Sequence, residues 1–524
     1  MLVYFGRKRF PYITKLIGQT SLDPSYSMLQ KDIYLKGILF LIVLLIFYPV
    51  CFTDYVYTDE ITQLWHYKPG SGFLMYGVQG RWIPELVLSR LYAAINTVHE
   101  ITYIRIIALA AWFVCIPVWY TVIKRIVANN PGYQYLPFFT CLYLVTSLPF
   151  AVSIQWATCM ELSLGNTAGL LSGAVLYFNI RYKEKLMAIP VLGALVAAGW
   201  GQLSLFTYQS CFGCFLIPFL LHYVSAYTIK KELVVAKGLA FYFLMYAVYF
   251  VLFKLSLKLN HIGNDPRADI HINLFNKLLF FLWQPLKRAF WFNVVVTNDN
   301  KLGVVAYVVL LFGWVALAFV RFGKANWKNA IKYIAVVLMI LLICYLPSLV
   351  VKENYSSNRT LQAIDVCVFA VYAEMVLCLV KNVQIREITG ISLALILTVL
   401  GWYNFNNQFL QPVHEEYIAV SDFIKQHYNK NIKTVYFIQP AENAFRSKYH
   451  IQSSMDEFGV PLTFPAWVPE DITRQMVYEK TGNRQEAAEL AIKFWPNMHS
   501  FAASGQAITE NTLLVNVPEL ITRK

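Results

Sequence analysis

Residues 37–61, GILFLIVLLIFYPVCFTDYVYTDEI, decide the fold class of this chain. The segment 37–53 is almost wholly apolar and close to the roughly 20 residues that a membrane-spanning helix needs. A basic leader, residues 1–36, precedes it, and no small-residue cleavage motif follows it, so we expect a retained first span with a cytoplasmic N-terminus. The segment ends on two adjacent carboxylates, Asp59 and Glu60, whose role beside a hydrocarbon core needs an explanation.

The composition of the chain extends this interpretation. Of 524 residues, 57% are hydrophobic and 14% are charged, against roughly 25% charged in soluble proteins. The mean hydropathy is +0.48. The formal net charge is +14, but the basic residues lie in short segments between apolar runs, which favours membrane topology over a nucleic-acid partner.

Eleven apolar runs are candidate spans, so residues 37–405 are expected to form a transmembrane domain of about 11 helices. They lie near 37–53, 102–123, 135–155, 160–180, 187–207, 209–229, 236–257, 302–320, 332–351, 361–380 and 388–405. Every second junction is basic, which places the loops 53–100 and 258–301 outside. The first of these loops carries an amphipathic interfacial helix. Residues 273–295 fit either a second interfacial helix or an additional span.

Residues 406–524 change character and predict a small α/β domain on the outer face. NKNIKTVYFIQP (429–440) and NTLLVNVP (511–518) are typical of strands, and RQEAAELAIKFW (484–495) is typical of a helix. The stretch is long enough for a modest core of its own.

The acidic pair Asp59 and Glu60 has two interpretations. A carboxylate near apolar surface has a raised pKa, which suits a general base, and adjacent acids can also share a divalent cation such as Mg²⁺ or Mn²⁺. The alternative is helix capping, because TDE before ITQLW places acids in a first helical turn. The sequence leaves both open.

Two arginines are candidate ligands for a lipid phosphate, which a guanidinium binds in a bidentate manner. They are Arg359, at the outer mouth of the tenth span, and Arg81 in GRWIPE, where Trp82 is a natural interface anchor. The alternative is snorkelling at the membrane surface.

Other polar residues at the outer ends of spans are candidates for binding sugar hydroxyls, although capping or helix packing explains them as well. They are Glu161, Tyr208 and Gln209. Asp365 and Glu374 are the main acids within spans. A solvated loop explains HIGNDPRADIHIN better than a metal site does; its ionisable residues are His261, Asp265, Arg267, Asp269 and His271. No phosphate-cradling glycine motif is present. Cys211 and Cys214 lie in an apolar run that favours packing, and no disulfide framework is expected.

Four short motifs together resemble a known family. TDE (58–60), GRW (80–82), YQS (208–210) and NRTL (358–361) are similar to motifs of the GtrII-like bacterial O-antigen glucosyltransferases, which are membrane glycosyltransferases of the GT-C fold. Family members commonly carry two aspartates where this chain has Asp59 and Glu60, which leaves open which of the two is the base.

The resemblance implies an inverting transfer of a hexose, glucose in the family, from a polyprenyl-phosphate donor. The acceptor would be a lipid-linked or cell-surface polysaccharide, such as lipopolysaccharide, on the outer face of the bacterial inner membrane, with the C-terminal domain periplasmic or extracellular. It implies Asp59 or Glu60 as base and Arg359 with Arg81 at the donor phosphate. Contacts to sugar or acceptor are then expected from Glu161, Tyr208, Gln209 and Trp82. No cofactor is required, although a divalent cation fits.

Two other functions stay open from the sequence. A polysaccharide polymerase or ligase would also combine large outer loops with lipid-linked substrates. A flippase or transporter for lipid-linked glycans would place ionisable groups near the bilayer midplane, whereas most acids of this chain lie at the outer edges of its spans.

Overall fold

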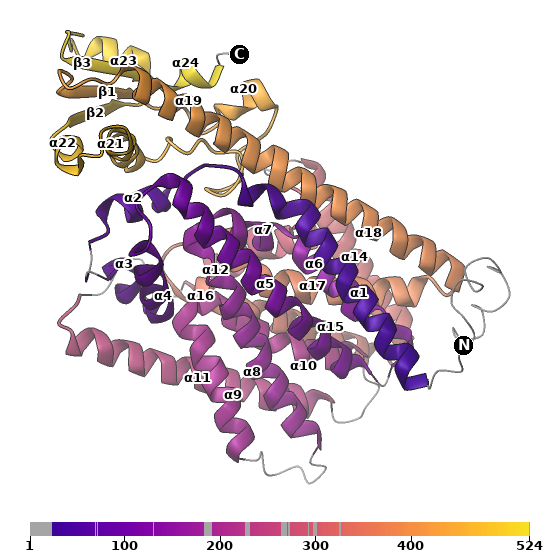
Figure 1. Cartoon of the computed structure of the whole chain (residues 1–524). Helices are drawn as coiled ribbons and strands as arrows, with labels where there is room; N and C mark the ends of the chain where they lie inside the picture. Colours follow the sequence, from indigo (N-terminus) through magenta and orange to yellow (C-terminus); the bar gives the residue numbers. More distant parts are fainter. Residues whose placement is uncertain are drawn as a thin grey trace.

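The computed structural model of the chain describes residues 24–522, apart from 69, 71, 129, 183–190, 226–230, 264–269, 271–272, 292, 297–300 and 324–325. Most of this part of the chain is helical, and a small parallel sheet lies near its C-terminal end (Figure 1).

Seven helices of the described chain are long and apolar enough to cross a membrane, and the chain is therefore a helical membrane protein. They are α1 (Pro24–Phe47), α5 (Val98–Val127), α11 (Lys231–Leu259), α14 (Lys301–Phe322), α15 (Trp327–Cys344), α17 (Gln362–Leu379) and α18 (Val383–Phe405), which continues through a π-helical turn into α19 (Gln411–His427). Helices α6 (Leu136–Thr146) and α7 (Leu148–Gln155) meet at a bend of 52° and add an eighth span if they cross together. The predicted number of eleven is not confirmed.

Three of the eleven predicted spans, 160–180, 187–207 and 209–229, are helices that do not meet the criteria of length and apolarity. They correspond to α8 (Leu162–Tyr182), α9 (Val191–Thr207) and a 3₁₀ segment, Gln209–Leu216, that leads into α10 (Ile217–Ser225). The polar residues of α8, among them Asn166 and Ser172, are buried within the protein. A helix that is surrounded by protein tolerates such residues and does not need the hydropathy of a lipid-facing one.

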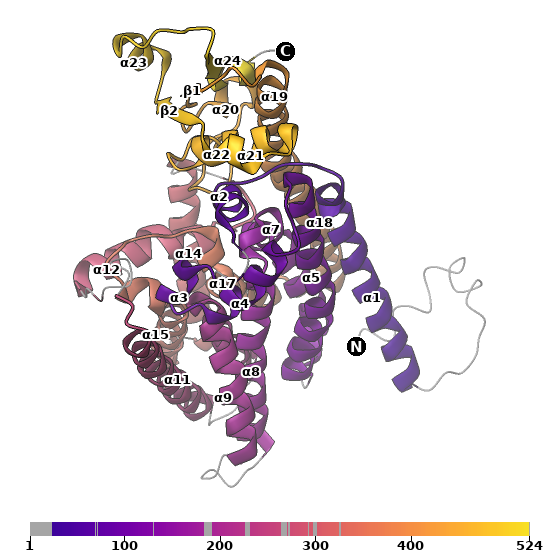
Figure 2. The same cartoon turned by 60° about the vertical axis from the view of Figure 1, so that its left-hand side comes forward.

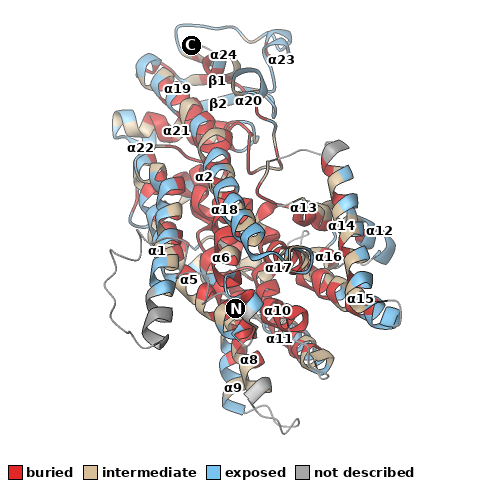
Figure 3. Ribbon diagram, turned by 90° about the vertical axis from the view of Figure 1, so that its right-hand side faces the viewer, coloured by how far each residue is buried: buried red, intermediate tan, exposed pale blue. Residues whose placement is uncertain are grey.

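The outer surface of the bundle is apolar. Figure 3 shows buried residues along its centre and exposed residues on the outward sides of α1, α14 and α18. The exposed side chains there are large and hydrophobic: Leu41, Leu45, Val309, Phe312, Ile391, Leu395 and Val399. A soluble protein rarely presents so continuous an apolar surface, which lipid would cover here.

The two predicted outer loops contain several short helices. The first holds α2 (Asp59–His66), α3 (Leu74–Val78) and α4 (Trp82–Tyr92), and α4 corresponds to the predicted amphipathic helix. The second holds α12 (Leu274–Phe281), a π-helical turn at 282–286 that contains Pro285, and α13 (Lys287–Phe290). Neither α12 nor α13 is long enough to be among the candidate spans. Helix α15 is followed by α16 (Leu346–Val350) and a 3₁₀ turn, η8 (Asn358–Thr360), before α17.

The C-terminal sheet has three parallel strands in the order β2-β1-β3. They are β1 (Thr434–Ile438), β2 (Ala491–Trp495) and β3 (Thr512–Asn516), and both predicted strands are confirmed. The helix predicted over 484–495 is wrong in its second half, because only α22 (Arg484–Ala488) is helical and AIKFW forms β2. The central strand β1 is buried at four of its five residues and pairs with β2 on one edge and β3 on the other. Pairing with β1 therefore makes AIKFW a strand in spite of its local helical pattern. Helices α20 (Phe445–Tyr449), α21 (Val468–Thr481), α23 (Met498–Ala503) and α24 (Val517–Thr522) complete this region.

The C-terminal region and the first outer loop lie at the same end of the bundle. Figures 1 and 2 show α2 directly beneath α21, whereas α1 begins at the opposite end. The contact between α2 and α21 is polar: Asp471 accepts a hydrogen bond from Thr62 at 2.7 Å and lies 2.9 Å from Nε2 of His66. The C-terminal region is thereby joined to the helix that begins with the acidic pair.

Candidate functional site

The two acids at the start of α2 have different surroundings. Asp59 is half-buried, whereas Glu60 is fully buried. One carboxylate oxygen of Glu60 accepts hydrogen bonds from the backbone N–H of Tyr57, at 2.7 Å, and from the Arg105 guanidinium, and the other oxygen accepts from the backbone N–H of Ala157. Burial raises the pKa of Glu60, and the charge of Arg105 opposes this shift. Glu60 therefore links the backbone before α2 to Arg105 of α5 and to Ala157, the first residue of the 3₁₀ turn Ala157–Cys159.

The backbone in front of Asp59 is strained. Thr58 has φ +38° and ψ −106°, in a region that a β-branched residue rarely adopts. Its hydroxyl is buried and has no hydrogen-bond partner among the described residues. Strain of this kind persists only where the surrounding contacts impose it, and it concentrates at functional sites. Here the contacts of Glu60 and Tyr57 impose it, and they fix the position from which Asp59 projects.

Arg359 lies in η8, which packs against α7. Its guanidinium is 3.2 Å from the Asp456 carboxylate and 3.3 Å from the Tyr355 hydroxyl. The guanidinium centre lies 4.6 Å from the ring centroid of Trp156. The side chain is 17% exposed, so the positive charge is held in a largely dry setting.

Arg81 and Trp82 stand at the start of α4 and reach the junction of α9 and α10. The guanidinium of Arg81 lies 4.1 Å above the ring of Tyr208, and Trp82 stacks on Phe206 at 4.1 Å between centroids. Gln209 donates to the backbone carbonyl of Gln79 at 2.7 Å. The motifs GRW and YQS, which are far apart in sequence, are thus in direct contact.

Glu161 precedes α8, outside the helices that could cross a membrane. Its side chain is buried, and its Oε2 has no hydrogen-bond partner among the described residues. Burial raises the pKa of the Glu161 carboxyl to about 7, and the charges of Arg81 and Arg359 act against that rise. A buried carboxyl that retains unused hydrogen-bonding capacity beside two arginines is a candidate for binding a ligand.

Electrostatic neighbours show which predicted residues come together. Arg81 and Arg359 both act on Glu161 and on Tyr208. Asp59 and Glu161 both act on the Tyr76 hydroxyl, whose pKa is raised mainly by burial. The site therefore unites side chains of α2, α4, the turn before α8, the α9–α10 junction and η8. We define the candidate site as Asp59, Arg81, Glu161, Tyr208 and Arg359. Glu60 holds the backbone next to Asp59 through its buried hydrogen bonds. Trp82 and Gln209 connect the segment around the start of α4 to the α9–α10 junction.

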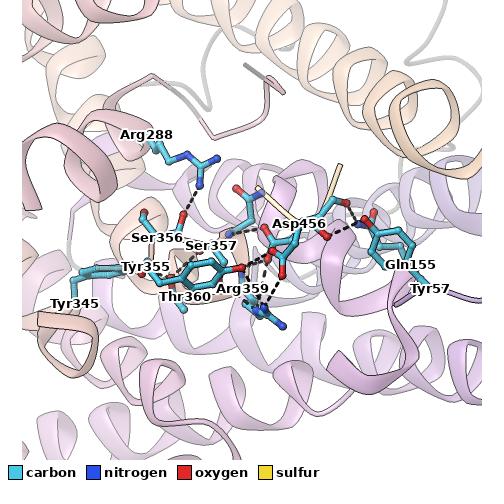
Figure 4. A network of polar contacts seen from close by, with 12 residues as sticks. Tyr57, Gln155, Arg288, Tyr345, Tyr355, Ser356, Ser357, Arg359, Thr360 and Asp456 are labelled. Atoms are coloured by element: carbon cyan, nitrogen blue, oxygen red, sulfur yellow. Dashed lines mark hydrogen bonds and ion pairs between the residues drawn. The ribbon is translucent and has the colours of Figure 1, made fainter. Parts of the chain in front are cut away.

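Two functional candidates were missing from the sequence interpretation. They are Asp456 and Glu457, in a tight turn of the C-terminal region that is closed by a bridge between Ser454 and Phe458. Figure 4 shows Asp456 against Arg359 and Tyr355, with Tyr57 and Gln155 on the other side of the turn. The acidic pair DE before FG was the available signal, but no spacing rule connects it to Arg359, 97 residues earlier.

The predictions for metal ligands find no further support. Within the described ranges, no group of three or more His, Cys, Asp and Glu side chains is placed to hold a metal ion. Of the ionisable residues in the loop HIGNDPRADIHIN, His261 is described, and Asp265, Arg267, Asp269 and His271 lie outside the described residues. The divalent cation stays a prediction.

The burial of Glu161 can be tested through the pH dependence of the protein's stability. Its pKa lies above the ordinary value of 4.5, so between about pH 4.5 and 7 the folded protein retains a proton that the unfolded chain has lost. Stability then falls as the pH rises through this window, by up to about 3 kcal/mol. We expect Glu161→Gln to match the wild-type melting temperature at pH 5 and to exceed it at pH 8. Glu442→Gln, at an exposed position, is the control, and parallel pH profiles for wild type and Glu161→Gln would contradict the assignment.

The helices define the class, a multi-pass helical membrane protein, and the candidate site lies where they meet the C-terminal region. No protein-family model, no curated protein and no solved structure matches the chain.

Proposed function

We propose that this chain is an inverting glycosyltransferase that moves a hexose from a polyprenyl-phosphate donor to a lipid-linked or cell-surface polysaccharide on the outer face of a bacterial inner membrane. The observation that supports this most is the convergence of Arg81, Arg359 and Glu161 beside the acidic start of α2. Positive charge for a departing phosphate and carboxylates for hydroxyl groups are what this reaction needs at one place.

In the proposed reaction, Asp59 removes the proton from an acceptor hydroxyl. The resulting oxygen attacks the anomeric carbon of the donor and forms the new glycosidic bond. The bond from that carbon to the phosphate oxygen breaks, and its electron pair leaves with the polyprenyl phosphate, so the configuration at the anomeric carbon inverts. Asp59 is the base because Glu60, with both oxygens bonded inside the protein, cannot reach a substrate without losing its partners.

The arginines and Glu161 take the remaining roles. Arg359 and Arg81 bind the donor phosphate and stabilise the charge that it gains as it leaves. Glu161 accepts hydrogen bonds from sugar hydroxyls with Oε2, which has no hydrogen-bond partner among the described residues. The aromatic faces of Trp156 and Tyr208, which already stack on these arginines, hold the guanidinium planes in position.

The arrangement of the chain ends supports the proposed topology. Helix α1 begins at the end of the bundle opposite to the sheet and the candidate site (Figure 1). With the N-terminus in the cytoplasm, as the basic junctions predict, the site and the C-terminal region face outward. There a lipid-borne donor is available and a nucleotide sugar is not needed.

The direct test is transfer by the purified full chain. We expect radiolabel to move from a polyprenyl-phosphate hexose to a member of a panel of lipid-linked glycan acceptors. Absence of product with every donor, combined with passage of lipid-linked glycans across vesicle membranes, would instead identify a flippase. Chain extension of the acceptor without use of a monosaccharide donor would identify a polymerase or ligase.

Arg359→Ala tests the role at the phosphate. We expect the KM for the donor to rise about 10- to 100-fold, since a charged hydrogen bond contributes about 1.5–3 kcal/mol, while the KM for the acceptor changes little. Initial rates with each substrate varied in turn measure this. Arg446→Ala, at an exposed position on α20, is the matched control. Equal increases in both KM values would contradict phosphate recognition by Arg359.

A further inference from the structure

One of the two arginines of the candidate site, Arg359, already holds an anion from its own chain. Arg359 Nη2 lies 3.2 Å from Oδ2 of Asp456, and the Tyr355 hydroxyl donates to the other oxygen of the same carboxylate (Figure 4). The Asp456 side chain is nevertheless 45% exposed. The contact is therefore accessible from outside rather than locked in a core.

The turn that carries Asp456 is held by other groups. Glu457, fully buried, accepts hydrogen bonds from the backbone N–H groups of Asn358, at 2.7 Å, and Arg359, at 3.3 Å. Gln155 donates to the Glu457 carbonyl at 2.8 Å, and the Tyr57 hydroxyl donates to the Asp456 carbonyl at 2.8 Å. Because these contacts do not involve the Asp456 carboxylate, that side chain can rotate off Arg359 while the turn stays in place.

A second observation beside Arg359 points to a ligand. The side chain of Asn358 is fully buried, and neither its amide nitrogen nor its amide oxygen has a hydrogen-bond partner among the described residues. Buried amides are normally satisfied, so this amide, on the residue that precedes Arg359 in η8, has hydrogen bonds to offer. A phosphate, with more acceptor oxygens than a carboxylate, would use both the guanidinium and the amide N–H donors.

We propose that Asp456 is an internal competitor for the phosphate-binding side chain of the site: its carboxylate occupies Arg359 until the phosphate group of a polyprenyl phosphate displaces it. The inference rests on the proposed function for the identity of the lipid. In the exchange, Nη2 of the guanidinium passes from one anion to another while Nε stays 3.8 Å from the buried Glu457 carboxylate, and this continuous pairing matters because an unpaired charge at this degree of burial is costly.

Binding of polyprenyl phosphate without a sugar tests the competition directly. We would measure its affinity for the full chain in nanodiscs, as wild type, Asp456→Asn, Asp456→Ala and Arg359→Ala, with inorganic phosphate as the second ligand. Asp422→Asn, at an exposed position on α19, controls for loss of one negative charge. We expect Asp456→Asn and Asp456→Ala to bind the lipid about fivefold more tightly than wild type and Asp422→Asn, and Arg359→Ala to bind weakly. Tightening for the lipid alone identifies a lipid phosphate, and tightening for both ligands identifies the phosphate group as the common element.

Two outcomes would overturn the inference. Unchanged or weaker binding by both Asp456 variants, with wild-type melting temperatures, would show that the carboxylate does not compete. A fall in kcat of about 100-fold with unchanged donor affinity would make Asp456 a participant in the reaction instead. The assay separates this inference from the proposed function, because binding needs no transfer: tighter binding in a protein that transfers no sugar would reject the glycosyltransferase and keep the competition. Sugar transfer by wild type, with unchanged lipid affinity in both Asp456 variants, would keep the glycosyltransferase and reject the competition.

Discussion

Asp59→Asn is expected to lower the rate of sugar transfer about 1,000-fold, within the range of roughly 10²–10⁴ that a general base contributes. Asparagine has nearly the same shape, and the first turn of α2 tolerates it, so the loss would be chemical rather than structural. Asp59 is the acid of the pair that remains half-buried, beyond the strained backbone of Thr58. The measurement is the initial rate at saturating donor and acceptor, with the melting temperature recorded in parallel.

The matched control for this substitution is Asp54→Asn. Asp54 lies five residues earlier, is 40% exposed and pairs with His99 at 2.7 Å, away from both arginines of the site. We expect this variant to keep most of its activity. A fully active Asp59→Asn would remove Asp59 from the mechanism, and the acidic start of α2 would then be a helix cap, as the sequence also allowed.

Hydropathy predicted the class of fold but not its number of spans. Helices α1 and α14 face lipid over much of their surface, so their sequences carry the full apolar signal. Helix α8 is enclosed by other helices and carries polar residues such as Asn166 and Thr167. A linear scan averages over both faces of a helix, and it cannot separate a span that faces lipid from one that faces protein.

The sequence predicted several individual residues of the candidate site but not which of them contact one another. Tyr208 and Arg359 stood out as polar residues at the ends of apolar runs, and Arg81 stood out in GRWIPE of the first outer loop. The structure places Arg81 on Tyr208. The partner of Arg359 did not stand out, because Asp456 belongs to a turn in the C-terminal region whose packing is a tertiary property. Arg105 is a different case. It lies within the apolar run 102–123, where burying a charge is costly, so its presence there indicates a buried partner of opposite charge. In the structure that partner is Glu60.

Breaking the pair of Glu60 and Arg105 is expected to cost about 3–5 kcal/mol of stability, because one buried charge remains without its partner. Both side chains are fully buried. We expect Glu60→Gln to cost more than Arg105→Met. Without Arg105 the Glu60 carboxyl can take up a proton, as its raised pKa already favours, whereas a guanidinium cannot lose one at any relevant pH. Thermal unfolding in detergent of both single variants and the double variant measures the coupling.

The pH dependence of that comparison is the stricter test. In Arg105→Met the Glu60 carboxyl takes up a proton more readily toward the acid end of the pH range, so the deficit of this variant should shrink there, while the deficit of Glu60→Gln should persist. The control is the ion pair of Lys448 and Glu415 at the surface. Swapping these two residues should change the free energy of unfolding by only about 0–1 kcal/mol at any pH in this range. Equal deficits for both single variants across this range would mean that the carboxylate of Glu60 is not the source of the cost. The buried pair would then support α2 through packing rather than through charge, and the distinction drawn between Asp59 and Glu60 would lose its physical basis.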